Sequence, residues 1–166
     1  MSIFRPKEIL KKYTDFDIEK YRKLGFDTIF VDIDNTIDYP DSPNPGTKEA
    51  FDFLHKLKES GFRVFLVSNN TKERIERFLN GEKYDYVDFA MKPLPFKYNK
   101  TIKKYGLDKK KIIALGDQLM TDVLGGKLSG IYPIYVKQLV EKDIVKTKIN
   151  RMMERFIFKH ILHEKV

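Results

Sequence analysis

The chain has 166 residues, 42% of them hydrophobic and 13% aromatic, which is enough for one buried core and short for two domains. It contains no cysteine, so disulfide bonds and cysteine-ligated metal sites are excluded. The formal net charge of +8 favours anionic partners, namely phosphate esters, nucleic acid or acidic lipid surfaces, without selecting one of them.

The sequence carries no sign of export or of a membrane span. The N-terminal residues MSIFRPKEIL lack the continuous apolar stretch of a signal peptide, and no apolar run approaches the roughly 20 residues that would cross a bilayer. We therefore expect a cytoplasmic protein, with peripheral contact at the inner face of the membrane as an option. Nucleic acid is not expected as a partner, because no basic motif is interleaved with aromatic residues.

Short apolar runs alternate with helical patterns along the chain. In chain order we expect a strand at 28–33, a proline-containing loop at 38–46, a helix at 47–60, a strand at 62–67, a helix at 70–80, a strand at 86–90, a helix at 96–105, a strand at 111–115, a short helix at 121–128 and a strand at 131–136. Strands that alternate with helices favour crossover connections, so we expect an α/β fold with a mainly parallel, five-stranded sheet.

Two segments flank this catalytic core, which spans about 27–137 of a single domain over 1–166. The N-terminal segment, 1–26, is expected to be helical. At the other end a basic amphipathic helix is expected at about 144–163, with apolar residues at helical spacing and lysines and arginines elsewhere on the wheel. That helix could pack its apolar stripe on the core or lie on an anionic leaflet, and both readings stay open.

Capping signals set the limits of the inner helices. Asn70 is well placed to cap the helix that follows it, because Glu73 stands three residues further on and Asn80 precedes a glycine at its end. Gly61 and Gly106 close the helices before them in the same way. These signals predict short loops between helices and strands.

Polar clusters follow four of the expected strands at the point where each ends. They are Asp32-Ile33-Asp34-Asn35-Thr36, Ser68-Asn69-Asn70, Met91-Lys92-Pro93, and Gly116-Asp117-Gln118 followed by Asp122. Open parallel sheets place their sites beyond the carboxyl ends of the strands, so these clusters should converge on one edge. Taken singly, an aspartate after a strand is more often a turn or a cap and a lysine is more often solvated, but the joint order argues for a site.

The residue types in these clusters suit phosphoryl chemistry. Asp32 and Asp34 lie two positions apart, so in an extended segment both carboxylates point to the same side and repel unless a cation or a proton lies between them. With Asp117 they favour a hard cation, for which Mg²⁺ fits best. A carboxylate can attack phosphorus while its neighbour moves protons. Ser68 could donate a hydrogen bond to the phosphoryl group, and Lys92 could supply a positive charge.

The segments DIDNT, SNN, MKP and GDQLMTD resemble the four motifs of haloacid dehalogenase-like phosphatases, over about 29–136. The resemblance implies a Rossmann-like, three-layer α/β/α sandwich with Asp32 as nucleophile and Asp34 as general acid/base. It implies three phosphate binders: Ser68, Asn69 and Lys92. It also implies Mg²⁺ held by Asp32, the main-chain carbonyl of Asp34 and Asp117, while Asp122 lies outside the direct ligands and orients Lys92 or a metal-bound water.

A narrower likeness points to the YqeG family within subfamily IIIA. It rests on the segments GDQLMTDVLGGKLSGIYPIYV, FAMKPLPF and VSNNTKERIERF, and on the basic N-terminal segment. That family is associated with dephosphorylating phosphatidylglycerophosphate. The resemblance therefore implies a lipid-borne phosphate ester as substrate and an anionic membrane as a peripheral contact.

The spacing of the motifs leaves no room for a cap domain over the site. Only 33 residues separate Asp34 from Ser68, and 23 separate Ser68 from Lys92, and both intervals are filled by the elements already named. An open site suits a phosphate that projects from a bilayer. Two alternatives remain: a phosphatase of a soluble sugar phosphate or nucleotide, and a non-catalytic basic binding protein, against which the paired aspartates argue.

Overall fold

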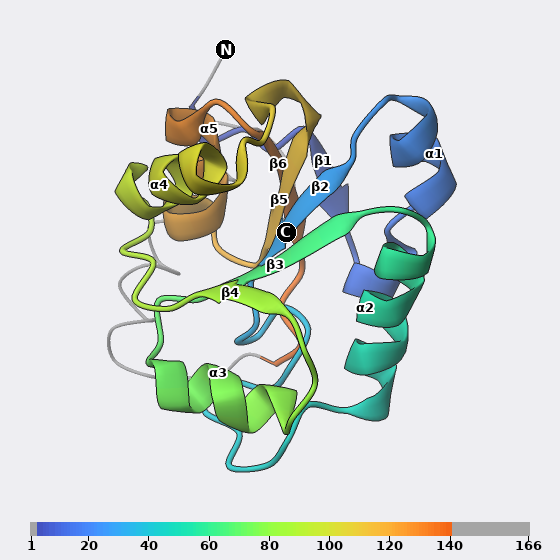
Figure 1. The fold of residues 1–166 in the computed structure, drawn as a ribbon, viewed down its shortest axis with the longest axis vertical. Coiled ribbons are helices and arrows are strands. Elements are labelled where there is room, and N and C mark those ends of the chain that lie inside the picture. Colours follow the sequence, from blue (N-terminus) through green and yellow to red (C-terminus); the bar gives the residue numbers. More distant parts are fainter. Residues whose placement is uncertain (1–2, 141–166) are drawn as a thin grey trace.

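The computed structural model describes residues 3–140, and Figure 1 shows their arrangement. They form a six-stranded sheet, parallel throughout, in the order β1-β6-β5-β2-β3-β4. The strands are β1 (Glu8–Leu10), β2 (Thr28–Val31), β3 (Arg63–Val67), β4 (Asp85–Val87), β5 (Ile112–Gly116) and β6 (Tyr132–Val136). The helices are α1 (Ile18–Lys23), α2 (Lys48–Glu59), α3 (Lys72–Leu79), α4 (Phe96–Tyr105) and α5 (Leu124–Ser129), with short turns η1 (Tyr13–Asp15), η2 (Lys109–Lys111) and η3 (Leu119–Val123).

Helices cover both faces of the sheet, which confirms the expected α/β/α layers. Helices α1, α2 and α3 lie against one face, and α4 and α5 lie against the other (Figure 1). Strand β2 is buried along its whole length: Ile29 and Val31 belong to the larger apolar core, and Phe30 between them belongs to the core on the opposite face. A continuous apolar run is what a central strand covered on both sides requires.

The expected count of five strands is wrong, because the N-terminal segment supplies a sixth. Strand β1 pairs in parallel with β6, from Glu8 opposite Ile134 to Leu10 opposite Val136. The segment that was expected to be helical thus contains both β1 and α1. A three-residue strand is too short for an alternating pattern to reveal it. The expected C-terminal helix at 144–163 falls outside the described residues.

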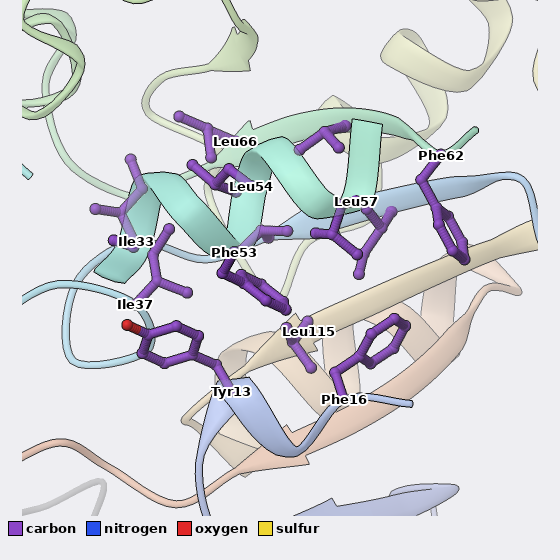
Figure 2. Packing of buried hydrophobic residues seen from close by; sticks show 14 of the residues in the cluster. Tyr13, Phe16, Ile33, Ile37, Phe53, Leu54, Leu57, Phe62, Leu66 and Leu115 are labelled. Carbon is purple, nitrogen blue, oxygen red and sulfur yellow. The ribbon is translucent and has the colours of Figure 1, made fainter. Parts of the chain in front are cut away.

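The larger core fills the space under α2. Figure 2 shows Phe53, Leu54 and Leu57 of this helix packed over Leu66 of β3 and Leu115 of β5. The sequence forms this helix because Thr47 caps it, its side chain accepting a hydrogen bond from the Ala50 N–H, and because the apolar side chains recur at helical spacing. This packing holds the central strands rigidly beneath the site.

Helix α3 begins one residue later than the capping signal indicated. Thr71, not Asn70, caps it, with its side-chain oxygen accepting from the Arg74 N–H. Either residue type can cap a helix, but the Asn70 amide is used elsewhere: its nitrogen donates to the Asp34 carboxylate at 2.8 Å. Asn70 therefore belongs to the candidate site and not to the helix cap.

The carboxyl ends of three strands meet at one point of the sheet. Val31 of β2 lies opposite Leu66 of β3 and Leu115 of β5. Within residues 3–140, only α2 and β3 stand between the first and second polar clusters, and only α3 and β4 between the second and third, so no cap domain covers this edge. In the same part of the chain, no helix is long and apolar enough to cross a bilayer.

Candidate active site

Asp32 is the first residue after central strand β2, and its carboxylate is buried. One oxygen accepts a hydrogen bond from the Lys92 ammonium at 2.6 Å, and the other accepts from the Thr36 hydroxyl at 2.8 Å. Burial raises the pKa of Asp32 to about 7, against the opposing pull of the Lys92 charge. The side chain is therefore fixed in one orientation, and it changes protonation near neutral pH.

Lys92 lies on the loop between β4 and α4, and its ammonium group has three protein acceptors. It donates to Asp32 at 2.6 Å, to Asp122 at 2.6 Å and to the Val67 carbonyl at 3.1 Å. Burial alone would lower the pKa of Lys92, but the Asp122 and Asp32 carboxylates outweigh it and raise the pKa well above its ordinary value. Lys92 therefore stays charged, which suits a group that stabilises anionic oxygens.

Asp122 contacts the Lys92 ammonium from the side away from Asp32. Its second oxygen accepts from the Gln118 N–H at 3.1 Å and from the Thr121 hydroxyl at 3.3 Å. These donors belong to a π-helical turn that follows β5. A glycine is needed at position 116, because a Cβ there would lie 2.3 Å from the Asp122 carboxyl carbon. The absence of a side chain at position 116 of β5 therefore leaves room for the Asp122 carboxylate.

The acidic residues around Asp32 fit a divalent cation. Asp32, Asp117 and Asp122 each offer an oxygen within 4.8 Å of the others. Asp122 accepts hydrogen bonds from three donors of the chain and Asp32 from two, which favours Asp32 over Asp122 as a direct ligand beside Asp117. Five carboxylates (Asp32, Asp34, Asp38, Asp117, Asp122) face two cationic side chains (Lys92, Arg74), a formal balance of −5 + 2 = −3. Oxygen ligands with excess negative charge are what Mg²⁺ requires.

Asp34 lies in a second ionic cluster, on the side of helix α3. Its carboxylate accepts from Asn70 at 2.8 Å and from the Arg74 guanidinium at 2.9 and 3.1 Å. Arg74 is itself buried and also binds Asp38 at 2.9 Å and the carbonyl of Tyr39 at 3.3 Å. Burial raises the pKa of Asp38, although Arg74 opposes the shift. The planar guanidinium thus fixes the Asp34 side chain in place.

Ser68 and Asn69 directly follow strand β3, beside this site. Ser68 is buried, and its hydroxyl oxygen accepts from the Asn70 N–H at 3.0 Å. The Asn69 amide binds the main chain of Lys92 twice: its oxygen accepts from the Lys92 N–H at 2.8 Å and its nitrogen donates to the Lys92 carbonyl at 3.2 Å. The Asn69 side chain therefore positions the Lys92 loop, a contact that the expected role in phosphate binding did not include.

Hydrogen bonds and ion pairs bring Asp32, Lys92, Asp117 and Asp122 into one group, while Asp34 faces Arg74 and Asn70. Sequence reasoning missed the participation of Arg74, Asp38 and Asn70. A signal for Arg74 was present: it stands four residues before Phe78, on the apolar stripe of α3, and only 4% of its surface is exposed. A charged residue on such a stripe needs a buried partner.

Comparison with known proteins shows the family of the chain. Residues 6–130 match the family described as haloacid dehalogenase-like hydrolases. The "probable phosphatase YqeG" of Bacillus subtilis (strain 168) is 33% identical over 154 residues, which cover 93% of this chain and 89% of that protein. A glyceraldehyde 3-phosphate phosphatase of Pyrococcus abyssi (strain GE5 / Orsay) is 26% identical over 102 residues, which cover 56% of this chain and 42% of that protein.

A solved structure extends the similarity to the fold. An uncharacterized protein from Listeria monocytogenes serotype 4b aligns with a TM-score of 0.58 at 19% identity, over 72% of this chain and 85% of that one. The family match covers the strands that end in the four polar clusters, and the relatives named above are phosphatases. The chain therefore belongs to the haloacid dehalogenase-like hydrolases and to the phosphatases among them.

Proposed function

We propose that the chain hydrolyses phosphate monoesters through a covalent aspartyl-phosphate on Asp32, and that its substrate is phosphatidylglycerophosphate in a bilayer. The observation that carries the reaction is the Asp32 carboxylate, fixed between the Lys92 ammonium and the Thr36 hydroxyl at the open end of the central strand. The narrower assignment to subfamily IIIA and to the YqeG family belongs to this proposal and is supported by the 33% identical relative.

The reaction runs in two displacements at phosphorus. An Asp32 oxygen attacks and forms a phosphorus–oxygen bond while the bond to the lipid alcohol breaks, and the alcohol oxygen takes a proton from Asp34. Asp34 then accepts a proton from water, whose oxygen attacks phosphorus and breaks the bond to Asp32. Inorganic phosphate leaves, and both aspartates return to their starting states. Lys92 and Ser68 bind the phosphoryl oxygens through both steps.

Asp34 can carry a proton while it remains fixed. Both Arg74 contacts go to one of its oxygens, and Asn70 donates to the other, which keeps a second lone pair. The two donors therefore restrict the rotation of the group without occupying every acceptor site. We infer that Arg74 is a positioning residue, since it acts on the reaction through Asp34.

We propose Mg²⁺ as the resident cation. Asp32, Asp117 and the main-chain carbonyl of Asp34 would hold it, with Asp122 outside the direct ligands. When bound, the ion would neutralise the excess carboxylate charge and polarise a phosphoryl oxygen. Thr36 stands between the two carboxylate ligands, 2.8 Å from Asp32 and 3.4 Å from Asp117, and orients them.

The lipid substrate is supported by three features. The most extensive similarity described above is to a YqeG protein, residues 3–140 contain no cap over the site, and the chain has a formal charge of +8. The proposal includes a cytoplasmic location with peripheral contact at the membrane. A soluble substrate is the second candidate, because the Pyrococcus abyssi relative is named for a soluble triose phosphate.

The test is phosphate release from phosphatidylglycerophosphate in liposomes, measured beside glyceraldehyde 3-phosphate and a panel of sugar phosphates and nucleotides. We expect Mg²⁺-dependent turnover of the lipid far above that of every soluble ester, and none by Asp32→Asn. Efficient hydrolysis of a soluble ester with no release from liposomes would reject the lipid substrate. No release from any ester would reject the phosphatase reaction.

A further inference from the structure

Exposed apolar side chains gather on the loop that carries Lys92. Eight large hydrophobic residues are exposed in the described part of the chain, and four of them fall within one stretch of eight residues. We call these four the apolar rim: Phe89 (52% exposed), Met91 (53%), Leu94 (53%) and Phe96 (64%). Single exposed apolar residues are ordinary, but four within eight positions of the chain, on both sides of a site residue, point to a contact surface.

Two residues of the rim have an unfavourable backbone conformation, which indicates that their side chains serve a function. Phe89 has φ 41° and Met91 has φ 57°, the left-handed region that glycine and asparagine adopt more readily. Both of these bulky apolar residues nevertheless stay more than half exposed among residues 3–140. Such strain concentrates at sites where a surface must be presented in a set direction.

The charge next to the rim identifies the partner. From Phe89 to Tyr105 the chain has five lysines and no acidic residue. Lys100 and Lys103 are exposed and follow Phe96 by four and seven positions, so they lie on the same face of α4. Lys100 is about 6 Å from Phe96 along the helix axis, within the Debye length of about 8 Å at physiological salt. An apolar tip followed by lysines is typical of contact with an anionic bilayer.

We propose that the apolar rim inserts into the interface of an anionic bilayer and sets the active site against the lipid headgroups. This inference rests on the proposed function, and it names the surface through which a lipid-borne phosphate would reach Asp32. The rim brackets Lys92 in the sequence, and the Lys92 ammonium touches Asp32. A bilayer that receives Phe89 and Phe96 therefore brings its phosphates to the same edge of the sheet as the nucleophile.

Tryptophan fluorescence tests the insertion directly, because the chain contains no tryptophan. The variant Phe96→Trp places one on the rim. Leu24→Trp and Leu128→Trp are matched controls, because both positions are exposed. Each precedes the first residue of a strand by four positions, so both lie near the amino ends of the strands, away from the carboxyl ends that carry the site. The probes are vesicles of phosphatidylcholine with and without phosphatidylglycerol.

We expect the Phe96→Trp emission to shift to shorter wavelength with phosphatidylglycerol vesicles, and the emission of both controls to stay unchanged. No shift at position 96, or an equal shift at positions 24 and 128, would overturn the proposal. A shift without vesicles that grows with protein concentration would mean that a second copy covers the rim. A shift without vesicles that is independent of concentration would mean that the chain itself covers it. Either result would also overturn the proposal.

A second variant separates this inference from the proposed function. Replacing all four rim residues by serine should lower the vesicle-bound fraction at least about tenfold, since binding scales with buried apolar area. Turnover of soluble p-nitrophenyl phosphate reports whether the fold and the catalytic centre are intact. Lipid substrate in detergent micelles should still be hydrolysed, while bilayer substrate should not. Equal hydrolysis of bilayer substrate by both proteins would reject the rim and leave the proposed function standing. If the wild-type chain inserts but hydrolyses phosphatidylglycerophosphate in neither form, the proposed substrate is wrong and the membrane surface stands.

Discussion

Two buried ionic clusters flank the loop after β2, and they differ in what their cations can do. The lysine cluster joins Asp32, Lys92 and Asp122, and the arginine cluster joins Asp34, Asp38 and Arg74. Each places one cation between two carboxylates. The lysine is a compact point charge on a flexible stem, whereas the guanidinium is a rigid planar fork that never loses its charge.

The difference matches the two tasks that phosphoryl transfer imposes. In the lysine cluster, burial raises the pKa of Asp32 to about 7, so its charge responds to its surroundings. In the arginine cluster, the fork reaches Asp34, Asp38 and a main-chain carbonyl at once, so geometry is held. We infer that the lysine cluster holds the nucleophilic carboxylate. The arginine cluster fixes the orientation of Asp34, which donates and accepts protons.

Removal of the nucleophile should have the largest effect on the lysine cluster. Asp32→Asn keeps the shape of the side chain but replaces the attacking carboxylate by a poor nucleophile, so kcat should fall at least about 10⁴-fold. Steady-state turnover of a soluble ester measures it, and circular dichroism checks the fold. Activity near that of the wild type would exclude the aspartyl-phosphate.

Removal of the cation from the same cluster should reduce both activity and stability. Lys92→Gln leaves Asp32 and Asp122 buried without their shared charge, so kcat/KM should fall roughly 10²- to 10³-fold. The free energy of unfolding should drop by about 3–5 kcal/mol. Urea denaturation of the metal-free variant and its wild-type control measures the second effect. An unchanged unfolding midpoint would mean that the cluster is not desolvated.

The matching change in the arginine cluster should affect kcat more than KM. Arg74→Lys retains a charge but loses the fork, so Asp34 is less well oriented and kcat should fall roughly 10- to 100-fold. The pH profile of kcat should also shift, which a purely structural role would not produce. Arg74→Gln should be less stable than Arg74→Lys, and adding Asp38→Asn should restore part of the loss. Equal pH profiles for wild type and Arg74→Lys would refute the positioning role.

The smallest expected effect is the pH dependence of metal binding at the lysine cluster. Because the pKa of Asp32 is raised to about 7 in the protein without metal, protons compete with Mg²⁺ below that pH. The affinity should be constant above pH 7 and fall about tenfold for each unit below it. Calorimetric titration between about pH 5.5 and 8, which covers values below and above the pKa of Asp32, measures how the Mg²⁺ affinity changes with pH. Asp32→Asn should flatten this dependence, and a slope that persists in this variant would point to another group.

The same contrast explains what could be predicted from the sequence. Helix α4 was predicted at its observed limits, Phe96–Tyr105, because Gly106 marks its end through local backbone preference. The lysine cluster was anticipated because its residues follow strand ends, where topology alone brings them together. Arg74 escaped notice because its partners Asp34 and Asp38 lie 40 and 36 positions away. Only the packed position of α3 brings them into contact.

Two further discrepancies also have tertiary causes. Asn70 and Thr71 are both good caps, and the choice between them depended on a tertiary contact with Asp34 that no propensity contains. Strand β1 has three residues, and what makes it a strand is the open edge of β6 beside it. Both cases show tertiary context deciding where local signals were short or evenly matched.

The position of β4 at the end of the sheet bears on how the molecule fluctuates. Strands β1 and β4 are both edge strands of three residues, and such a strand opens locally at a lower free energy than central β2, so the β4 amides should exchange with solvent before those of β2. The rim loop follows β4. Asn69, however, fastens both the N–H and the carbonyl of Lys92 to the end of inner strand β3. The residues of the rim loop can therefore change conformation at an irregular bilayer surface. Lys92 meanwhile keeps its position beside Asp32.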